Sequence, residues 1–179
     1  MYDFVISDTH FFHDNIIKYA GRPQNHVELM IKEWQDTVRP DQTVLHLGDV
    51  LMGKPDLWPL IDELPGKVDV LVSGNHDEPY KRKWLEENWG WTFVKDFQMR
   101  YRGWEVYFSH YPLWVDAMGG PIGRLMLDPN WKNVNIHGHI HEKQAPSPFH
   151  INVSVEWIEY RPTPLQALLD NYIETNPTI

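Results

Sequence analysis

The sequence predicts an α/β fold in one domain of 179 residues. Short apolar runs alternate with segments of helical periodicity through the first half of the chain, which indicates parallel βαβ units. The second half changes to hairpin and strand patterns. The length suits one sizeable core rather than two, and 42% apolar with 23% charged residues is typical of a globular protein. We therefore expect a single domain, 1–179, with no internal repeat.

In the first half, apolar runs predict the strands and helical periodicity predicts the segments between them. Strands are expected over 4–7, 43–47 and 68–72. Helices are expected from an Asp14 or Asn15 cap to Tyr19, and over 27–38, 56–64 and 78–88. Each predicted strand ends in a polar cluster.

In the second half, residues 97–101 and 105–109 flank Arg102-Gly103, which is typical of a β-hairpin. Further strands are expected over 133–136 and 149–155, with a terminal helix over 164–172. The intervening loop, 115–130, contains the glycine- and proline-rich stretch 118–123. We expect it to be a mobile loop beside the site.

The net charge of −9 disfavours a long nucleic-acid groove, because such grooves need a basic face. The basic cluster Lys81-Arg82-Lys83 is interpreted as a solvated helix face. An acidic chain still admits a small nucleotide or phosphoester substrate, since two bound dications would make a pocket locally positive.

The absence of cysteine excludes disulfides and thiolate zinc sites. No apolar run approaches the roughly 20 residues of a membrane helix, and no signal peptide is visible, so we expect a cytoplasmic protein that does not insert into membranes. Trp84, Trp89 and Trp91 fall in polar surroundings. They are expected at a rim or interface, which leaves a homodimer possible.

Five clusters of candidate metal ligands follow predicted strands. They are Asp8-Thr9-His10, Gly48-Asp49, Gly74-Asn75-His76-Asp77, His110 and Gly138-His139-Ile140-His141. Ligands collect beyond the carboxyl ends of strands in α/β sheets. Carboxylate, amide and imidazole donors together suit a pair of divalent transition metals, and such a pair suits phosphate ester hydrolysis. Each cluster alone also fits a turn, a helix cap or a buried histidine.

The spacing within the clusters favours convergence. Asp8 and His10 are alternate residues and can face one metal. Asp49 follows a glycine that permits a tight turn, which leaves both carboxylate oxygens available to bridge two ions. His139 and His141 can serve one metal each.

The ordered set Asp-x-His, Gly-Asp, Gly-Asn-His-Asp, His, Gly-His-x-His resembles the calcineurin-like metallophosphoesterases over residues 8–141. Residues 7–11, 15–17, 152–155 and 160–162 are similar to the small, capless bacterial and phage members. The resemblance implies a four-layer αββα sandwich of two mixed β-sheets flanked by helices. It also implies a metal-dependent phosphoric ester hydrolase.

The resemblance implies a role for each cluster. Asp8, His10 and His141 would bind one metal, Asn75, His110 and His139 the other, and Asp49 would bridge them around a nucleophilic hydroxide. Manganese is expected, although these donors also accept Fe, Ni, Co or Zn. His76 would act on the transition state and leaving oxygen, and Asp77 would hold the His76 ring.

Substrate contacts beyond the metals are expected from His13 and Arg22, because phosphate needs further donors. The alternatives are a helix-start residue for His13 and a solvated charge for Arg22. Val50-Leu51-Met52-Gly53 replaces the charged residues of phosphoprotein-directed members. A phosphodiester, most simply a small or cyclic nucleotide, is therefore the expected substrate, with a phosphomonoester as the alternative. A catalytically silent metal-binding scaffold is disfavoured because His76 and every ligand are present.

Overall fold

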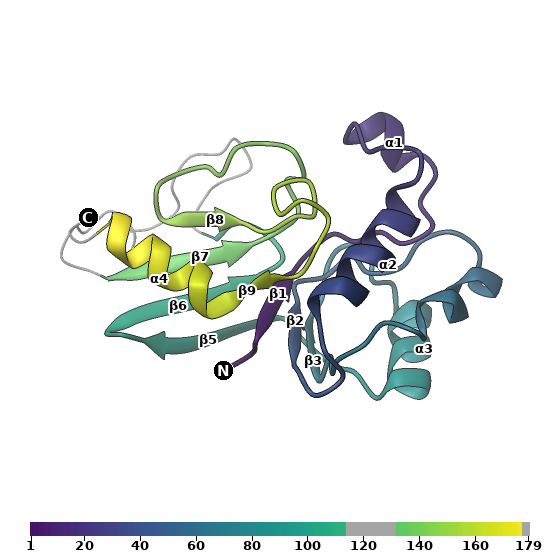
Figure 1. Ribbon diagram of the computed structural model, residues 1–179, viewed down its shortest axis with the longest axis horizontal. Coiled ribbons are helices and arrows are strands. Elements are labelled where there is room, and N and C mark those ends of the chain that lie inside the picture. The colour runs from purple at the N-terminus through teal and green to yellow at the C-terminus, as the bar shows by residue number, and fades with distance from the viewer. Residues whose placement is uncertain (114–131, 177–179) are drawn as a thin grey trace.

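A computed structural model describes residues 1–113 and 132–176, which form two β-sheets and their flanking helices (Figure 1). The first sheet has the order β4-β3-β2-β1-β9, in which β1 to β4 are parallel and β9 is antiparallel to β1. Its strands are β1 Phe4–Ile6, β2 Val44–His46, β3 Val70–Val72, β4 Thr92–Val94 and β9 Thr163–Pro164. The expected loop 115–130 lies outside the described residues.

The second sheet has the order β5-β6-β7-β8. Its strands are β5 Asp96–Tyr101, β6 Trp104–Ser109, β7 Asn133–His137 and β8 His150–Asn152. Strands β5 and β6 form the predicted hairpin, whose Arg102 (φ 48°) and Gly103 (φ 82°) both adopt the left-handed conformation of a two-residue turn. Strands β6, β7 and β8 are parallel. The prediction of two mixed sheets with flanking helices is therefore confirmed.

The helices are α1 Ile16–Tyr19, α2 His26–Thr37, the 3₁₀ helix η1 Pro55–Ile61, α3 Pro79–Trp89 and α4 Leu165–Thr175. Helices α2 and α3 cover the first sheet on the side away from the second, whereas α4 lies over the second sheet (Figure 1). Residues 56–64 were expected to be α-helical. Pro59 inside the segment has no N–H to donate, and a short 3₁₀ helix forms instead.

The alternation of side chains along the strands divides the core in two. Phe4 and Ile6 of β1 pack in the cluster under α2, η1 and α3, whereas Val5 faces the cluster shared with the second sheet. Helix α4 contributes Leu165 and Leu169 to that second cluster. The apolar face of each strand thus fixes the orientation of its polar C-terminal extension.

The two sheets meet beside the polar clusters. Ser7, just beyond β1, forms a parallel bridge with Ser154, just beyond β8. The Ser7 N–H donates to the Val153 carbonyl at 3.0 Å. Strand β8 ends at Asn152, earlier than the predicted strand 149–155, although the Val153 N–H still donates to the His137 carbonyl of β7 at 2.8 Å.

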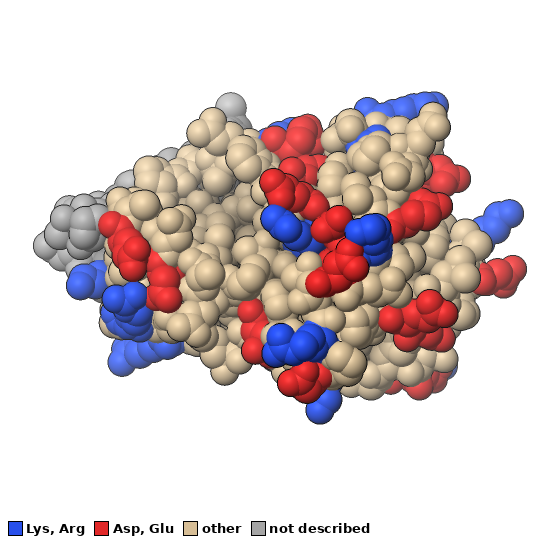
Figure 2. Space-filling model, in the orientation of Figure 1, with Lys and Arg blue, Asp and Glu red and all other residues tan. Residues whose placement is uncertain are grey.

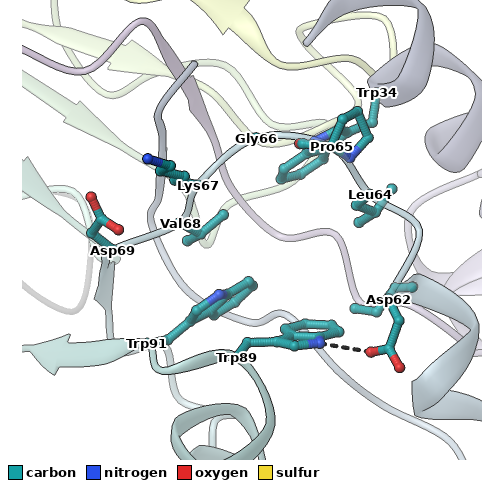
Figure 3. Close-up of a pocket in the computed structure, with 11 residues that line it drawn as sticks. Trp34, Asp62, Leu64, Pro65, Gly66, Lys67, Val68, Asp69, Trp89 and Trp91 are labelled. Atoms are coloured by element: carbon teal, nitrogen blue, oxygen red, sulfur yellow. Dashed lines mark hydrogen bonds between the residues drawn. The ribbon is translucent and has the colours of Figure 1, made fainter. Parts of the chain in front are cut away.

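Tryptophans gather around a pocket at the opposite end of the first sheet, among residues that precede β3 and β4 (Figure 3). Trp89 packs between Trp84 and Trp91, with ring centroids 5.1 and 4.9 Å apart, and donates to Asp62 at 2.6 Å. Trp91 is buried. Trp84 and Trp89 are partly exposed, and the homodimer stays a prediction.

Basic and acidic side chains are interspersed over the face shown in Figure 2. Of the helices in residues 1–113 and 132–176, none has the length and hydropathy of a bilayer-crossing segment.

Candidate metal centre

The predicted ligand residues converge at the carboxyl ends of five strands. Asp8 and His10 follow β1, Asp49 follows β2, and Asn75 follows β3. From the second sheet, His110 follows β6, and His139 and His141 follow β7. Both sheets therefore contribute to one site along the seam described above.

The backbone at these residues is unusual. Asp8, His10, Asp49, His139 and His141 all have positive φ, between 43° and 70°. Non-glycine residues seldom adopt this conformation, and each instance costs about 1–3 kcal/mol. Such strain persists where the surrounding structure imposes it, and here it turns each side chain back toward a common centre.

Two glycines allow the loops to approach closely. A Cβ atom on Gly74 would lie 2.1 Å from Asp49 Oδ1, and one on Gly138 would lie 2.1 Å from Asp8 Oδ2. Both positions therefore require the absence of a side chain.

The first group of donors comprises Asp8, His10 and His141, each with one ligand atom within 4.8 Å of the others. Asp8 Oδ2 accepts hydrogen bonds from the His139 N–H at 2.8 Å and from Ser154 Oγ at 3.0 Å. Asp8 Oδ1 and both ring nitrogens of His10 are buried without a hydrogen-bond partner. Buried polar atoms are almost always paired, so these atoms fit the coordination of a cation.

The second group comprises Asp8, Asp49 and His110, again within 4.8 Å. Asp49 Oδ2 lies 3.4 Å from His10 Nε2 and 3.4 Å from His110 Nε2, so one carboxylate oxygen stands between imidazoles of the two groups. His110 Nε2 is 3.0 Å from Asn75 Oδ1, and the His139 ring centroid is 5.1 Å from that of His110. All seven predicted ligands therefore belong to one constellation.

Burial and mutual charge perturb these groups. Burial alone would raise the pKa of Asp49, but hydrogen bonding and charge from His110, with the charge of His10, hold that pKa well below its usual range. Burial disfavours protonated His110, yet the hydrogen bond to Asp49 and the charges of Asp8 and Asp49 raise its pKa to about 9. A bound metal would have to displace that proton.

His76 lies beside the donors and outside both groups. Its ring centroid is 5.4 Å from that of His10. Its N–H donates to Asp49 Oδ1 at 2.8 Å, and its carbonyl accepts from Lys81 Nζ at 2.8 Å. The His76 backbone is thus fixed from both sides.

The prediction that Asp77 holds the His76 ring is wrong, because the Asp77 carboxylate bonds to other groups. Asp77 Oδ2 accepts from the N–H groups of Asp49 at 2.8 Å and Gly74 at 2.7 Å, and Oδ1 accepts from Val50 at 3.1 Å. None of the contacts of the described residues joins Asp77 to the His76 ring. A carboxylate with three backbone donors ties two loops together instead of orienting an imidazole.

The expected phosphate contact by Arg22 is also wrong. Its side chain is fully buried. Its guanidinium donates to Glu156 Oε1 at 2.7 Å, the Thr9 carbonyl at 2.8 Å and the Asp8 carbonyl at 2.6 Å. Because these protein groups accept the hydrogen bonds of the buried guanidinium, Arg22 is not available to a substrate phosphate.

His13 remains next to the donors. Its ring centroid is 5.8 Å from that of His10, the residue is partly exposed, and its Nδ1 is buried without a hydrogen-bond partner.

Sequence reasoning missed four residues that support the site: Lys81, Asn152, Ser154 and Glu156. Lys81 was assigned to a solvated helix face but is only 2% exposed, and it pairs with Glu78 at 2.6 Å. Asn152 Nδ2 donates to the His141 carbonyl at 2.8 Å. The alternation of Asn152 and Ser154 at the end of a strand could have indicated a shared face, whereas Glu156 lies in the turn that follows.

Carboxylate and imidazole donors beyond the strand ends of a two-sheet α/β fold define a class of metal-dependent hydrolases. The calcineurin-like phosphoesterase superfamily domain matches residues 1–152, and the chain belongs to this superfamily. An uncharacterized protein of Methanocaldococcus jannaschii is 30% identical over 179 residues, covering 93% of this chain and 88% of its own length. The crystal structure of an Aquifex aeolicus protein of unknown function superposes with a TM-score of 0.74 at 26% identity, covering 93% of this chain and 97% of that one.

Proposed function

We propose that this protein hydrolyses a phosphodiester with the help of two divalent transition metal ions, manganese first among them. One observation carries the proposal. Asp49 Oδ2 lies 3.4 Å from His10 on one side and 3.4 Å from His110 on the other. A shared carboxylate between two sets of donors is the arrangement that a metal pair needs.

Asp8, His10 and His141, which form one donor group, would hold one ion. Asn75, His110 and His139, whose side chains lie together, would hold the other, with Asp49 common to both. When bound, the ions would lower the pKa of water from about 15.7 toward 7 and neutralise charge on the phosphate. The unpartnered Asp8 Oδ1 and His10 nitrogens support the first set. The 3.0 Å approach of Asn75 Oδ1 to His110 Nε2 supports the second.

His76 would act on the substrate and not on the metals. It lies outside both donor groups, and its backbone is fixed by Asp49 and Lys81. A ring held beside the centre in this way can stabilise charge on the phosphate and pass a proton to the leaving oxygen.

A small or cyclic nucleotide fits the surroundings of the donors. Tyr111 is 48% exposed, with its ring centroid 4.3 Å from that of His139, and Tyr19 is 74% exposed and 6.3 Å from His13. Exposed rings beside the centre offer stacking surfaces for a base. With a net charge of −9, the chain suits a small ligand better than a polymer.

The test is turnover by metal-free protein reconstituted with Mn²⁺. Bis(p-nitrophenyl) phosphate and p-nitrophenyl phosphate would be compared, followed by 2′,3′- and 3′,5′-cyclic nucleotides. We expect the diester to be hydrolysed faster than the monoester. Faster monoester turnover would indicate a phosphomonoesterase. No turnover of any substrate with Mn²⁺, Fe²⁺, Ni²⁺ or Zn²⁺ would contradict the proposal and leave a metal-binding scaffold.

A further inference from the structure

A buried ion pair joins two distant parts of the chain behind the first donor group. Arg22 follows α1, Glu156 follows β8, and Arg22 Nε lies 2.7 Å from Glu156 Oε1. The two side chains are 0% and 5% exposed. We propose that Arg22 and Glu156 are positioning residues that hold Asp8, His10 and His141 in their metal-binding arrangement. This inference rests on the proposed function.

The carboxylate acts on the His141 ring. Glu156 Oε1 lies 3.2 Å from His141 Nδ1. An ionised carboxylate can only accept, so His141 Nδ1 carries the proton and Nε2 becomes the nitrogen with a free lone pair. A carboxylate behind a ligating histidine fixes the ring and its tautomer in this way and makes the imidazole a better donor.

The guanidinium acts on the backbone of the other two ligands. Arg22 Nη2 donates to the Asp8 carbonyl and Nη1 to the Thr9 carbonyl, which belongs to the peptide leading into His10. Asp8 and His10 have φ of 57° and 43°, a conformation that non-glycine residues seldom adopt. A planar fork with fixed donors can hold two successive carbonyls in one orientation, which a lysine cannot.

The segment beyond β8 makes further contacts with the same group. Asn152 Nδ2 donates to the His141 carbonyl at 2.8 Å, and Ser154 Oγ donates to Asp8 Oδ2 at 3.0 Å. Asn152, Ser154 and Glu156 therefore all form hydrogen bonds with Asp8 or His141. Among the described residues, neither Arg22 nor Glu156 has such a contact with Asn75, His110 or His139. Asp8 belongs to both donor groups, but His10 and His141 belong to the first alone, so the pair should affect one ion more than the other.

The experiment measures both metal affinities in Glu156→Gln and Arg22→Lys by Mn²⁺ titration of the metal-free proteins. We expect one of the two affinities to fall about 10–100-fold, as for other outer partners of metal ligands, and the second to stay within about threefold of wild type. The matched control is Asp170→Asn, which removes a carboxylate from Arg102 at a distant ion pair and should change neither affinity.

A second readout is independent of metal and of turnover. Nitrogen-15 NMR of the metal-free wild type, at a pH where His141 is neutral, should show its proton on Nδ1, and Glu156→Gln should lose that preference. A wild-type proton on Nε2 would overturn the inference. So would equal weakening of both affinities, or unchanged affinities with lower stability, because each indicates a purely structural ion pair. If the wild type bound no metal, the proposed function would fail, and the tautomer would still test the positioning role.

Discussion

At the scale of single residues, the candidate metal centre depends on a backbone conformation that non-glycine residues seldom adopt. Five of the seven proposed ligands have positive φ, and two glycines stand where a Cβ atom would strike Asp8 or Asp49. The strain, about 1–3 kcal/mol at each position, must be offset by the rest of the fold. The contacts of Arg22 with the Asp8 and Thr9 carbonyls are one such compensation.

The division between ligands and catalyst predicts the effect of His76→Ala. Metal content should remain at the wild-type level, because His76 is not one of the seven proposed ligands and, unlike His10, His110 and His141, belongs to neither donor group. Turnover should fall about 10²–10⁴-fold, the usual effect of losing an acid–base group. Metal analysis and diester turnover on the same sample check this. Loss of bound metal in this variant would show that His76 is a ligand.

Sequence reasoning identified the proposed ligands because each follows a recognisable strand, and the resemblance supplied their order. It chose Arg22 correctly as a residue of interest and gave it the wrong partner. Its actual partner, Glu156, lies 134 residues away, and no local pattern encodes such a contact. Asp77 was misassigned for the same reason, since two of its backbone partners follow β2, 27 and 28 residues earlier.

At the scale of elements, α3 controls the loop that carries His76. Lys81 lies in the first turns of α3, and its Nζ donates to the His76 carbonyl at 2.8 Å and contacts Glu78 at 2.6 Å. A buried ammonium is tolerated only where it is paired, as it is here. The helix therefore connects the packing under the first sheet to the position of a proposed catalytic ring.

Lys81→Met should loosen this connection while keeping the apolar stem. We expect turnover to fall roughly 10–100-fold, because small misplacements of a reacting group are costly, with metal content unchanged. Lys83→Met is the matched control, since Lys83 is in the same helix but 73% exposed. Equal activity in the two variants would refute the role assigned to Lys81.

At the scale of the whole molecule, the two-sheet arrangement was largely predictable, and its edges were not. Strand β9 was missed because two residues are too short for a periodic signal. Strand β4 was missed because none of its three residues is buried, unlike those of the equally short β1 and β2. Their pairing is decided by the neighbouring strands β3 and β1. The seam between Ser7 and Ser154 was equally invisible, because it joins residues from opposite ends of the chain.

Buried histidines should make the metal-free protein sensitive to acid. Burial lowers the pKa of His46 to about 3 and that of His137 to about 4. Both values lie below the usual 6.5, so the unfolded chain takes up protons first and stability falls as pH decreases below 6.5. Each histidine should cost about 2 kcal/mol between pH 6.5 and 5.

The pH dependence of stability has the opposite sign for His110, whose pKa is raised to about 9. Its contribution is present below pH 6.5 and is lost as pH rises through 9. Urea unfolding of metal-free protein at pH 5, 6.5 and 9 should therefore show greatest stability near pH 6.5. A protein more stable at pH 5 than at pH 6.5 would rule out neutral, buried His46 and His137.

The most direct test of a shared two-metal centre is metal stoichiometry in wild type and Asp49→Asn, measured beside diester turnover. Asp49 Oδ2 lies between His10 and His110, so its charge should serve both ions. The account predicts two Mn²⁺ per wild-type chain, and weakened binding of both ions with loss of turnover in the variant. One ion per wild-type chain, or two ions and full turnover in Asp49→Asn, would contradict it.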